Sequence, residues 1–245
     1  MDQKFENKYP QLIISAAILG LSLIICVALA AGAWTKQRST ISVTGAATKQ
    51  LRSDYAVWSC GFARRSNDRA EVLAALKKDL QEVVSFLRAK GISESEITVQ
   101  PANISTMYKV DQHGRETNEV LGYTAYQSFE VKARDVDKVT AAFRSIGELL
   151  DRGVDLQVAP PQYFYTKLDE LKVEMLAEAT KNARERAKRI AEDGGGSIGP
   201  LRSARMGVFQ ITPVNSNEVS DYGINDTSSL EKKITAVVNA EFFIK

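Results

Sequence analysis

The chain has 245 residues, 44% of them hydrophobic, and its 32 basic and 30 acidic side chains give a formal net charge of +2. This balance supplies no strongly basic surface, so we expect no nucleic-acid partner. Only two cysteines occur, Cys26 within an apolar segment and Cys60 alone in the remainder. No intrachain disulfide is therefore expected to stabilise the part of the chain beyond the segment.

The apolar segment runs from Leu12 to Trp34, and no charged residue lies between Lys8 and Lys36. A helix of about 20 apolar residues crosses a bilayer core of roughly 30 Å, so the segment is long enough to span a membrane. The rest of the chain contains no second run of this kind. The sequence therefore predicts a single membrane pass that carries a water-soluble domain.

A cleaved export signal is the alternative, because Ala28-Leu29-Ala30 offers a small-residue cleavage pattern. The apolar run is longer than the roughly 7 to 15 residues of a signal core, and this length favours an uncleaved anchor. We predict a leader at residues 1–11, a transmembrane anchor or uncleaved signal at 12–34, and an extracytoplasmic domain at 35–245. The bilayer is thus an expected partner through Leu12 to Trp34.

The flanking charges hardly decide how the apolar segment is oriented in the membrane, since Lys4 and Lys8 precede it and Lys36 and Arg38 follow it. Both a signal and an N-terminal anchor most simply export the domain C-terminal to them. We therefore expect a single-pass membrane protein with a cytoplasmic N-terminus and a periplasmic or cell-surface C-terminal domain.

Hydrophobic periodicity, turn residues and helix caps predict the elements of the exported part in chain order. The expected strands are Ile41–Thr44, Ser53–Arg64, Ile97–Tyr108, Leu121–Lys132, Val154–Tyr165, Ile198–Ile211 and Ile234–Ile244. The expected helices run from a cap at Asp68 to Gly91, from a cap at Asp135 to Gly153, and over Lys167–Asp193. A long polar loop, Pro213–Ser229, precedes the last strand.

Two of these strand–helix–strand units are weakly similar, since each places a basic residue, Gly and an aliphatic residue before a strand that contains Pro. KGISESEITVQPANIST and RGVDLQVAPPQYFYT carry this similarity. We predict an α+β fold with a mixed, mainly antiparallel sheet, long helices packed on it, and one N-terminal transmembrane helix.

The helix at Lys167–Asp193 carries a stripe of mostly small side chains that would let another backbone approach closely. The stripe comprises Leu168, Leu171, Met175, Ala179, Ala183, Ala187 and Ile190. Its second half is basic, with Glu178, Glu185 and Glu192 interspersed. A solvated face that complements the helix dipole explains these charges better than nucleic-acid binding does.

Motifs that carry chemistry are scarce. Gly194–Gly199 matches G-x-G-x-x-G, but it comes after a helix and before a strand, which is the reverse of a dinucleotide site. His113 is the only histidine and lies in a polar hairpin loop, which argues against a metal cluster or a Ser-His-Asp triad. Asp221 and Asp226 lack an apolar setting that would separate their pKa values.

Two further features are weak. Asn103 and Asn225 begin glycosylation sequons, a frequent chance match. Cys60 lies in a strand-like segment and is interpreted as a small buried hydrophobe, with a redox-sensing thiol as the alternative. We predict no catalytic residue, no cofactor and no metal site, and therefore a protein that is not an enzyme.

Several segments in order resemble the SIMPL-domain family, beginning with ISVTGAATKQLRSDYAVWSCGFARRSNDRAEVLAAL. The similarity continues in RAKGISESEITVQPANISTMY, LGYTAYQSFEVKARDVDKV and LKVEMLAEATKNARERAKRIAEDGGGSIG, and covers about Ile41 to Lys245. Two departures occur: VTGAA stands where the family often has V-T-G-E-G, and TKLDEL replaces its usual Ser-Asp step before the long helix.

The resemblance implies an exported bacterial α+β domain that forms ring-like or hollow oligomers and is associated with envelope stress and oxidative defence. It supplies no catalytic residues. The leading hypothesis is a membrane-anchored, non-enzymatic, homo-oligomeric scaffold in the bacterial envelope, with subunits meeting through strand edges and the Ala-rich helix. The alternative is a ligand-binding or redox-responsive periplasmic protein that uses Cys60 or an inter-subunit cavity, and a hydrolase ranks third.

Overall fold

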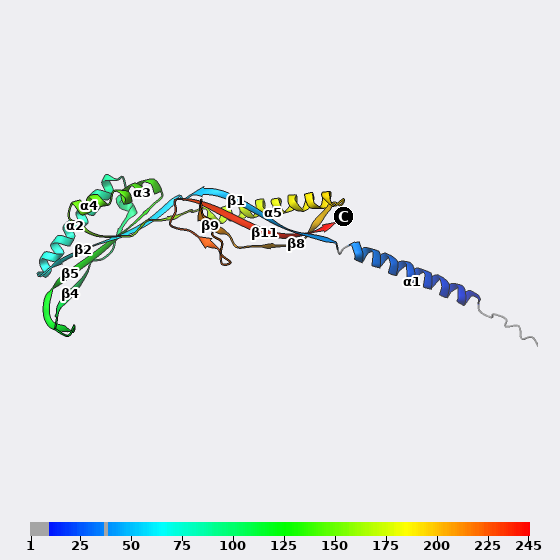
Figure 1. The fold of residues 1–245 in the computed structure, drawn as a ribbon, viewed down its shortest axis with the longest axis horizontal. Coiled ribbons are helices and arrows are strands. Elements are labelled where there is room, and N and C mark those ends of the chain that lie inside the picture. Colours follow the sequence, from blue (N-terminus) through cyan, green and yellow to red (C-terminus); the bar gives the residue numbers. More distant parts are fainter. Residues whose placement is uncertain (1–9, 37–38) are drawn as a thin grey trace, which may run out of the picture. The chain divides into compact units, whose positions relative to one another are not determined.

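The computed structural model describes residues 10–36 and 39–245 (Figure 1). The helices are α1 Pro10–Lys36, α2 Arg69–Ala89, α3 Val136–Arg144, α4 Gly147–Asp151 and α5 Leu168–Asp193, with a 3-10 turn, η1, at Glu94–Glu96. The strands are β1 Thr40–Arg52, β2 Tyr55–Ser66, β3 Ile97–Val99, β4 Asn103–Val110, β5 Glu116–Ala133, β6 Asp155–Val158, β7 Gln162–Phe164, β8 Ile198–Met206, β9 Gln210–Pro213, β10 Ile224–Asn225 and β11 Glu231–Ile244.

The chain divides into two compact units. Unit 1 comprises the residues up to Ala47, Val173–Val208 and Ala236–Lys245, and unit 2 comprises Thr48–Lys172 and Phe209–Thr235. The elements β1, α5 and β11 each contribute residues to both units. The predicted α+β class is confirmed. The assigned strand pairs are antiparallel except for the short parallel pair of β10 with β9.

Helix α1 contains the predicted apolar segment. Its stretch Ile14–Gly32 is long and apolar enough to cross a membrane, and none of this stretch is buried by the rest of the protein. Large side chains such as Leu19 and Leu29 are 70% and 69% exposed, so α1 is not the core helix of a water-soluble domain. The finding fits both a membrane anchor and a signal sequence. Lys4, Lys8 and Arg38, whose charges bear on the orientation, lie outside the described residues.

Unit 2 is built around the antiparallel pair of β2 and β5, which stay in register from Ala56 opposite Ala133 to Ser66 opposite Tyr123. Strands β3 and β4 pair with β5, while β6 and β7 pair with β2, so the later strands of each half of the predicted duplication pair with the first strand of the other half. The arrangement gives each half an equivalent strand partner.

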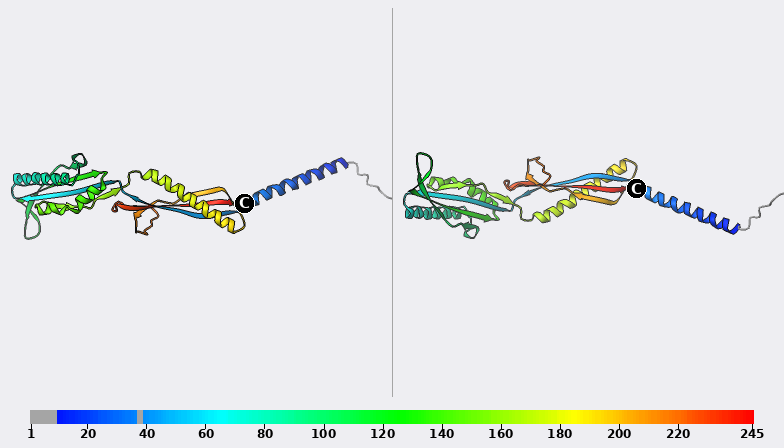
Figure 2. Two further views of the ribbon diagram at one scale, coloured as in Figure 1. Left: turned by 90° about the horizontal axis from the view of Figure 1, so that it is seen from above. Right: turned by 90° about the horizontal axis from the view of Figure 1, so that it is seen from below.

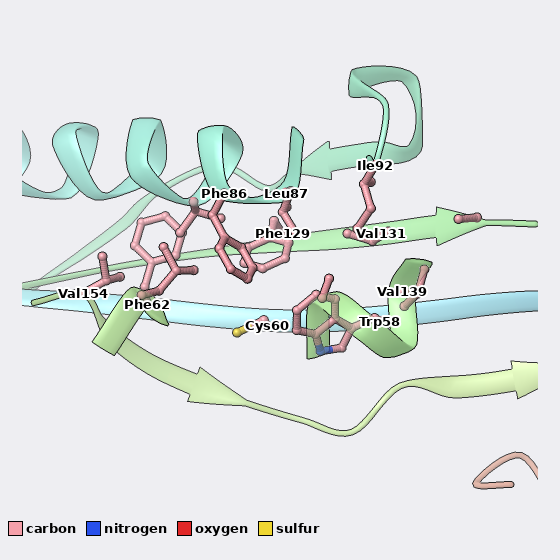
Figure 3. Packing of buried hydrophobic residues seen from close by; sticks show 14 of the residues in the cluster. Trp58, Cys60, Phe62, Phe86, Leu87, Ile92, Phe129, Val131, Val139 and Val154 are labelled. Atoms are coloured by element: carbon pink, nitrogen blue, oxygen red, sulfur yellow. The ribbon is translucent and has the colours of Figure 1, made fainter. Parts of the chain in front are cut away.

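The core of unit 2 lies between this sheet and helices α2, α3 and α4, as Figure 3 shows for its large side chains. Alternate residues of β2 form its buried face, since Ala56, Trp58, Cys60 and Phe62 are at most 3% exposed. The Trp58 ring packs edge-on against Phe129, with ring centroids 5.8 Å apart. Alternation along β2 therefore places its bulky residues on the helix-covered side of the sheet.

Helix α2 begins and ends as its sequence predicts. The Asp68 carboxylate accepts hydrogen bonds from the backbone amides of Ala70 and Glu71, which satisfies two donors of the first turn. Asp68 and Glu71 have the spacing of a capping box, but the Glu71 side chain accepts a hydrogen bond from the Ser66 hydroxyl. Gly91, with a φ of 83°, ends the helix in the left-handed conformation.

Several predicted elements of unit 2 are interrupted in the structure. The strand expected at Ile97–Tyr108 breaks into β3 and β4 around Pro101, and that expected at Val154–Tyr165 breaks into β6 and β7 at Pro160-Pro161. Proline has no amide hydrogen for the ladder, which accounts for both breaks. The Trp58 indole donates to the carbonyl of Ala159 at 3.0 Å and satisfies one backbone group at the second break.

Two other predicted boundaries were also wrong. The helix expected after Asp135 is split into α3 and α4 at Ser145–Ile146, and Leu150 in α4 is 53% exposed. Strand β5 begins at Glu116 rather than Leu121, so the hairpin turn is shorter than its polar sequence suggested.

Unit 1 is formed by α5 with parts of β1 and β11 and with β8 (Figure 2). Strand β8 pairs antiparallel with β11, and β1 neighbours β11 in the same sheet. The alanine stripe of α5 is buried, and its contact residue on β1 is Gly45, where a Cβ would overlap the backbone of Ala179 and Ala183. The backbone predicted to approach this stripe is thus the chain's own first strand.

The ends of the predicted elements in unit 1 shift for physical reasons. Strand β1 runs from Thr40 to Arg52, longer than predicted. Ala191, not Ile190, continues the buried stripe of α5, since Ala179, Ala183 and Ala187 recur every four residues. The strand predicted at Ile198–Ile211 breaks near Gly207 into β8 and β9, which belong to different units.

Candidate functional site

Cys60 lies in the core of unit 2 and not at a reactive surface. It is 3% exposed, and its thiol donates a hydrogen bond to the neighbouring Gly61 carbonyl at 3.7 Å. Burial raises the pKa of the Cys60 thiol to about 11, against a weak lowering by the Gly61 hydrogen bond. A reactive cysteine needs an exposed, electropositive setting and a lowered pKa, so these features support the interpretation of Cys60 as a buried hydrophobe.

We expect Cys60 in a Cys26→Ala background to react with a maleimide at pH 8 at least about a hundredfold more slowly than a thiol in the unfolded chain. Few Cys60 thiols are ionised at that pH, and the sulfur is covered. Labelling kinetics in native buffer and in guanidinium chloride measure the ratio. Equal rates in both solvents would revive the redox-responsive alternative.

The glycine-rich motif ends a helix, as predicted. Helix α5 stops at Asp193, the Gly196 amide donates to the Ala191 carbonyl at 2.8 Å, and β8 begins at Ile198. Gly195 has a φ of 78°, the conformation typical of a helix C-terminus. The motif therefore does not offer a helix N-terminus to a phosphate.

The other sequence candidates are separated and mostly exposed. His113 is exposed in the turn between β4 and β5, where its amide donates to the Asp111 carboxylate. Asn103 is exposed at the start of β4, and Asn225 is exposed in β10. Among the described residues, no three histidine, cysteine or acidic side chains group together as metal ligands.

Lys232 is a buried polar residue that sequence reasoning missed. It is 2% exposed, and its ammonium donates to the Tyr163 carbonyl at 2.6 Å and to the Asp226 carbonyl at 2.5 Å. Burial lowers the pKa of Lys232, which the charge of Asp226 partly opposes. These bonds tie the start of β11 to β7 and to the loop before β11.

Asp226 is the acidic neighbour of Lys232. Burial opposes its ionisation, but hydrogen bonds from Ser228 and Ser229 outweigh burial and lower its pKa. Its Oδ2 atom is buried and has no hydrogen-bond partner among the residues that the structure describes. Asp221, for which the sequence offers no reason to pair with Asp226, is exposed. A cavity of about 40 Å³ beside Lys232 is lined largely by aromatic and aliphatic side chains and has room for little more than water. The arrangement fits a buried cation that fixes a loop.

The outer edge of β8 is an open strand edge in unit 1. Among the described residues, β8 pairs only with β11, so the main-chain groups on its other side have no strand partner. Leu201 and Met206 pair with the buried Phe242 and Val238, yet they are 47% and 57% exposed. The cover over β11 therefore does not extend to β8, and the open edge carries exposed apolar side chains.

Unit 2 carries a second exposed apolar surface on the ribbon formed by β4 and β5. Tyr108 pairs with Val120, and these side chains are 40% and 47% exposed, while Val110 is 60% exposed. Two strands without a covering layer are marginally stable alone. Both surfaces are suited to contact with another protein surface.

Comparison with known proteins assigns the chain to a family. The family described as SIMPL, protein of unknown function (DUF541), matches residues 41–242. An uncharacterized protein YggE of Edwardsiella ictaluri is 24% identical over 198 residues, which cover 78% of each chain. An interleukin-1 receptor-associated kinase 1-binding protein 1 homolog of Xenopus laevis is 24% identical over 163 residues, 65% of this chain and 60% of the frog protein. Because the family match spans most of its length, this chain belongs to the SIMPL family.

Proposed function

We propose that the chain is a membrane-anchored, extracytoplasmic, non-enzymatic scaffold that forms a ring- or cage-like homo-oligomer in the bacterial envelope and contributes to stress defence. The observation that best supports assembly into an oligomer is the open edge of β8, with its exposed side chains Leu201 and Met206. A strand edge of this kind is a template for pairing with a further strand. A second copy of this chain is a partner that is present wherever the chain itself is present, and most soluble oligomers are homo-oligomers.

The proposal of an anchor rests on helix α1, because its stretch Ile14–Gly32 is not buried by the rest of the described chain. An anchor confines copies to two dimensions and raises their effective concentration, so a modest edge contact is sufficient for assembly. The absence of a catalytic role is supported by the buried Cys60, the exposed His113 and the lack of a metal-ligand group among the described residues.

Two lysines on the β8 edge should disrupt assembly. We expect Leu201→Lys/Met206→Lys to shift the full chain, in mild non-ionic detergent at micromolar concentration, from an oligomer to smaller species. Each charge would have to be buried beside the incoming subunit, which is costly without an ion partner. Light scattering coupled to size exclusion measures the protein mass.

The matched control is Leu150→Lys on α4, because Leu150 is exposed to a similar extent and belongs to unit 2, whereas β8 belongs to unit 1. It should leave the oligomer intact. A wild-type chain that is strictly monomeric at micromolar concentration would contradict the assembly proposal. Intact mass spectrometry of chain extracted from membranes tests the anchor separately, since cleavage after Ala30 would remove α1.

A further inference from the structure

Unit 1 contains a groove of about 420 Å³ between the start of β1 and the last turns of α5. Its lining combines cationic, hydroxyl and apolar side chains: Ser42, Val43, Thr44, Arg186, Arg189 and Ile190. No acidic side chain is among them. The groove is therefore suited to an anion that also carries an apolar part.

The groove lies next to the close contact of helix and strand. Gly45 lets α5 approach β1, and the Asn182 carboxamide accepts from the Ala46 amide at 3.1 Å. One helical turn further, the Arg186 guanidinium donates to the Thr44 carbonyl at 3.0 Å. This bond holds the Arg186 side chain across the gap between helix and strand, and the guanidinium makes no other hydrogen bond or ion pair with the described residues.

Arg189 is exposed, and the structure gives it no hydrogen-bond or ion-pair partner among the described residues. The nearby Glu192 pairs instead with Lys188, at 3.7 Å. Ile190, next to Arg189, is 56% exposed despite its large apolar side chain. Two guanidinium groups can bind a phosphate through paired N–H donors, and an apolar floor suits the start of a hydrocarbon chain.

Chain length limits how far this groove can lie from α1. Helix α1 ends at Lys36 and β1 begins at Thr40, so Ser42 is at most about 21 Å from Lys36, at about 3.5 Å per residue. The Ile244 amide also donates to the Ser39 carbonyl, which brings the C-terminal strand to the same end of unit 1. With α1 in a bilayer, this end of unit 1 is held near the lipid headgroups.

We propose that this groove binds the headgroup of an anionic phospholipid, with Arg186 and Arg189 at the phosphate and with Val43 and Ile190 against the adjoining apolar portion. The inference rests on the proposed anchor, because α1 is what delivers the groove to the bilayer surface. Anionic lipid attracts each basic side chain near a membrane surface by about a factor of five in affinity. Bound lipid would fix unit 1 against the membrane.

The test uses native mass spectrometry of the full chain in non-ionic detergent, with phosphatidylglycerol or phosphatidylcholine of identical acyl chains added. The wild type should retain phosphatidylglycerol preferentially. Arg186→Gln/Arg189→Gln should weaken that retention about 25-fold, the product of two fivefold losses. Glutamine removes the charge and leaves a polar side chain at two exposed positions of α5.

The matched control is Arg184→Gln, which removes the same charge from an exposed position of α5 outside the groove lining. It should bind phosphatidylglycerol as the wild type does. Equal retention of both lipids, an equal loss in the control, or displacement of lipid by millimolar inorganic phosphate would overturn the proposal. The same spectra give oligomer mass and α1 integrity, so failure of the scaffold or anchor is seen independently of lipid preference.

Discussion

Replacing Gly45 with valine is expected to destabilise unit 1 by about 3 kcal/mol, near the upper end of overpacking costs. A Cβ at this position would overlap the Ala179 carbonyl oxygen and the Ala183 amide nitrogen. Both are backbone atoms of a helix, so no side-chain rotation can relieve the overlap. Helix α5 would have to move away from β1, and the buried alanine stripe would lose its contact.

Amide hydrogen exchange of the full chain measures this effect locally, because α5 should lose protection while α2 keeps it. Gly207→Ala is the matched control in unit 1. A Cβ there would lie 3.5 Å from the Val237 carbonyl oxygen, an ordinary contact, and should cost less than about 1 kcal/mol. Wild-type protection of α5 in the valine variant would contradict the packing described for Gly45.

Local signals in the sequence predicted the helix starts and the buried faces well. Asp68 and Asp135 accept from the amides of the first turns of α2 and α3, as their positions suggested. Strand ends were less predictable. Hydrophobic alternation continues through Pro101 and Pro160-Pro161, while the missing amide hydrogens interrupt the ladders there.

Contacts between residues far apart in the chain could not be predicted from local sequence patterns. The alanine stripe of α5 predicted a close backbone neighbour, and the glycine in V-T-G was visible, but nothing in either segment linked Gly45 to Ala183. The stripe does allow a backbone to approach closely, but that backbone belongs to β1 of the same chain and not to another subunit. The stripe is buried within unit 1, which leaves strand edges as the surface available for assembly.

The polar residues Lys232 and Arg186 also show that local sequence patterns do not predict tertiary contacts. Lys232 stands in a strand with alternating burial, and only the tertiary contacts with Tyr163 and Asp226 reveal that its amine is enclosed. The basic half of α5 was interpreted as a solvated face, which holds for Lys188 and Arg184. Arg186 differs, because β1 places a carbonyl within its reach.

Removing Arg64 is expected to destabilise unit 2 by about 3 to 5 kcal/mol. Its guanidinium donates to both carboxylate oxygens of Asp79, at 2.5 and 2.7 Å, and to the Gly153 carbonyl at 2.7 Å. Asp79 is 3% exposed on the inner face of α2. Arg64→Met would leave this carboxylate buried without a cation, and the cost comes from that unpaired charge rather than from the lost attraction.

A double-mutant cycle separates the two contributions. Arg64→Met/Asp79→Leu removes both charges and should recover most of the loss seen in Arg64→Met, because an apolar pair needs no solvation. The surface pair of Arg115 and Asp111 is the comparison: Arg115 is 76% exposed, and Arg115→Met should cost less than about 1 kcal/mol. Urea denaturation followed by tryptophan fluorescence measures all variants, since Trp58 lies in the same core. If Arg64→Met costs no more than Arg115→Met, the carboxylate of Asp79 is solvated in solution and α2 is not held to β2 by this ion pair.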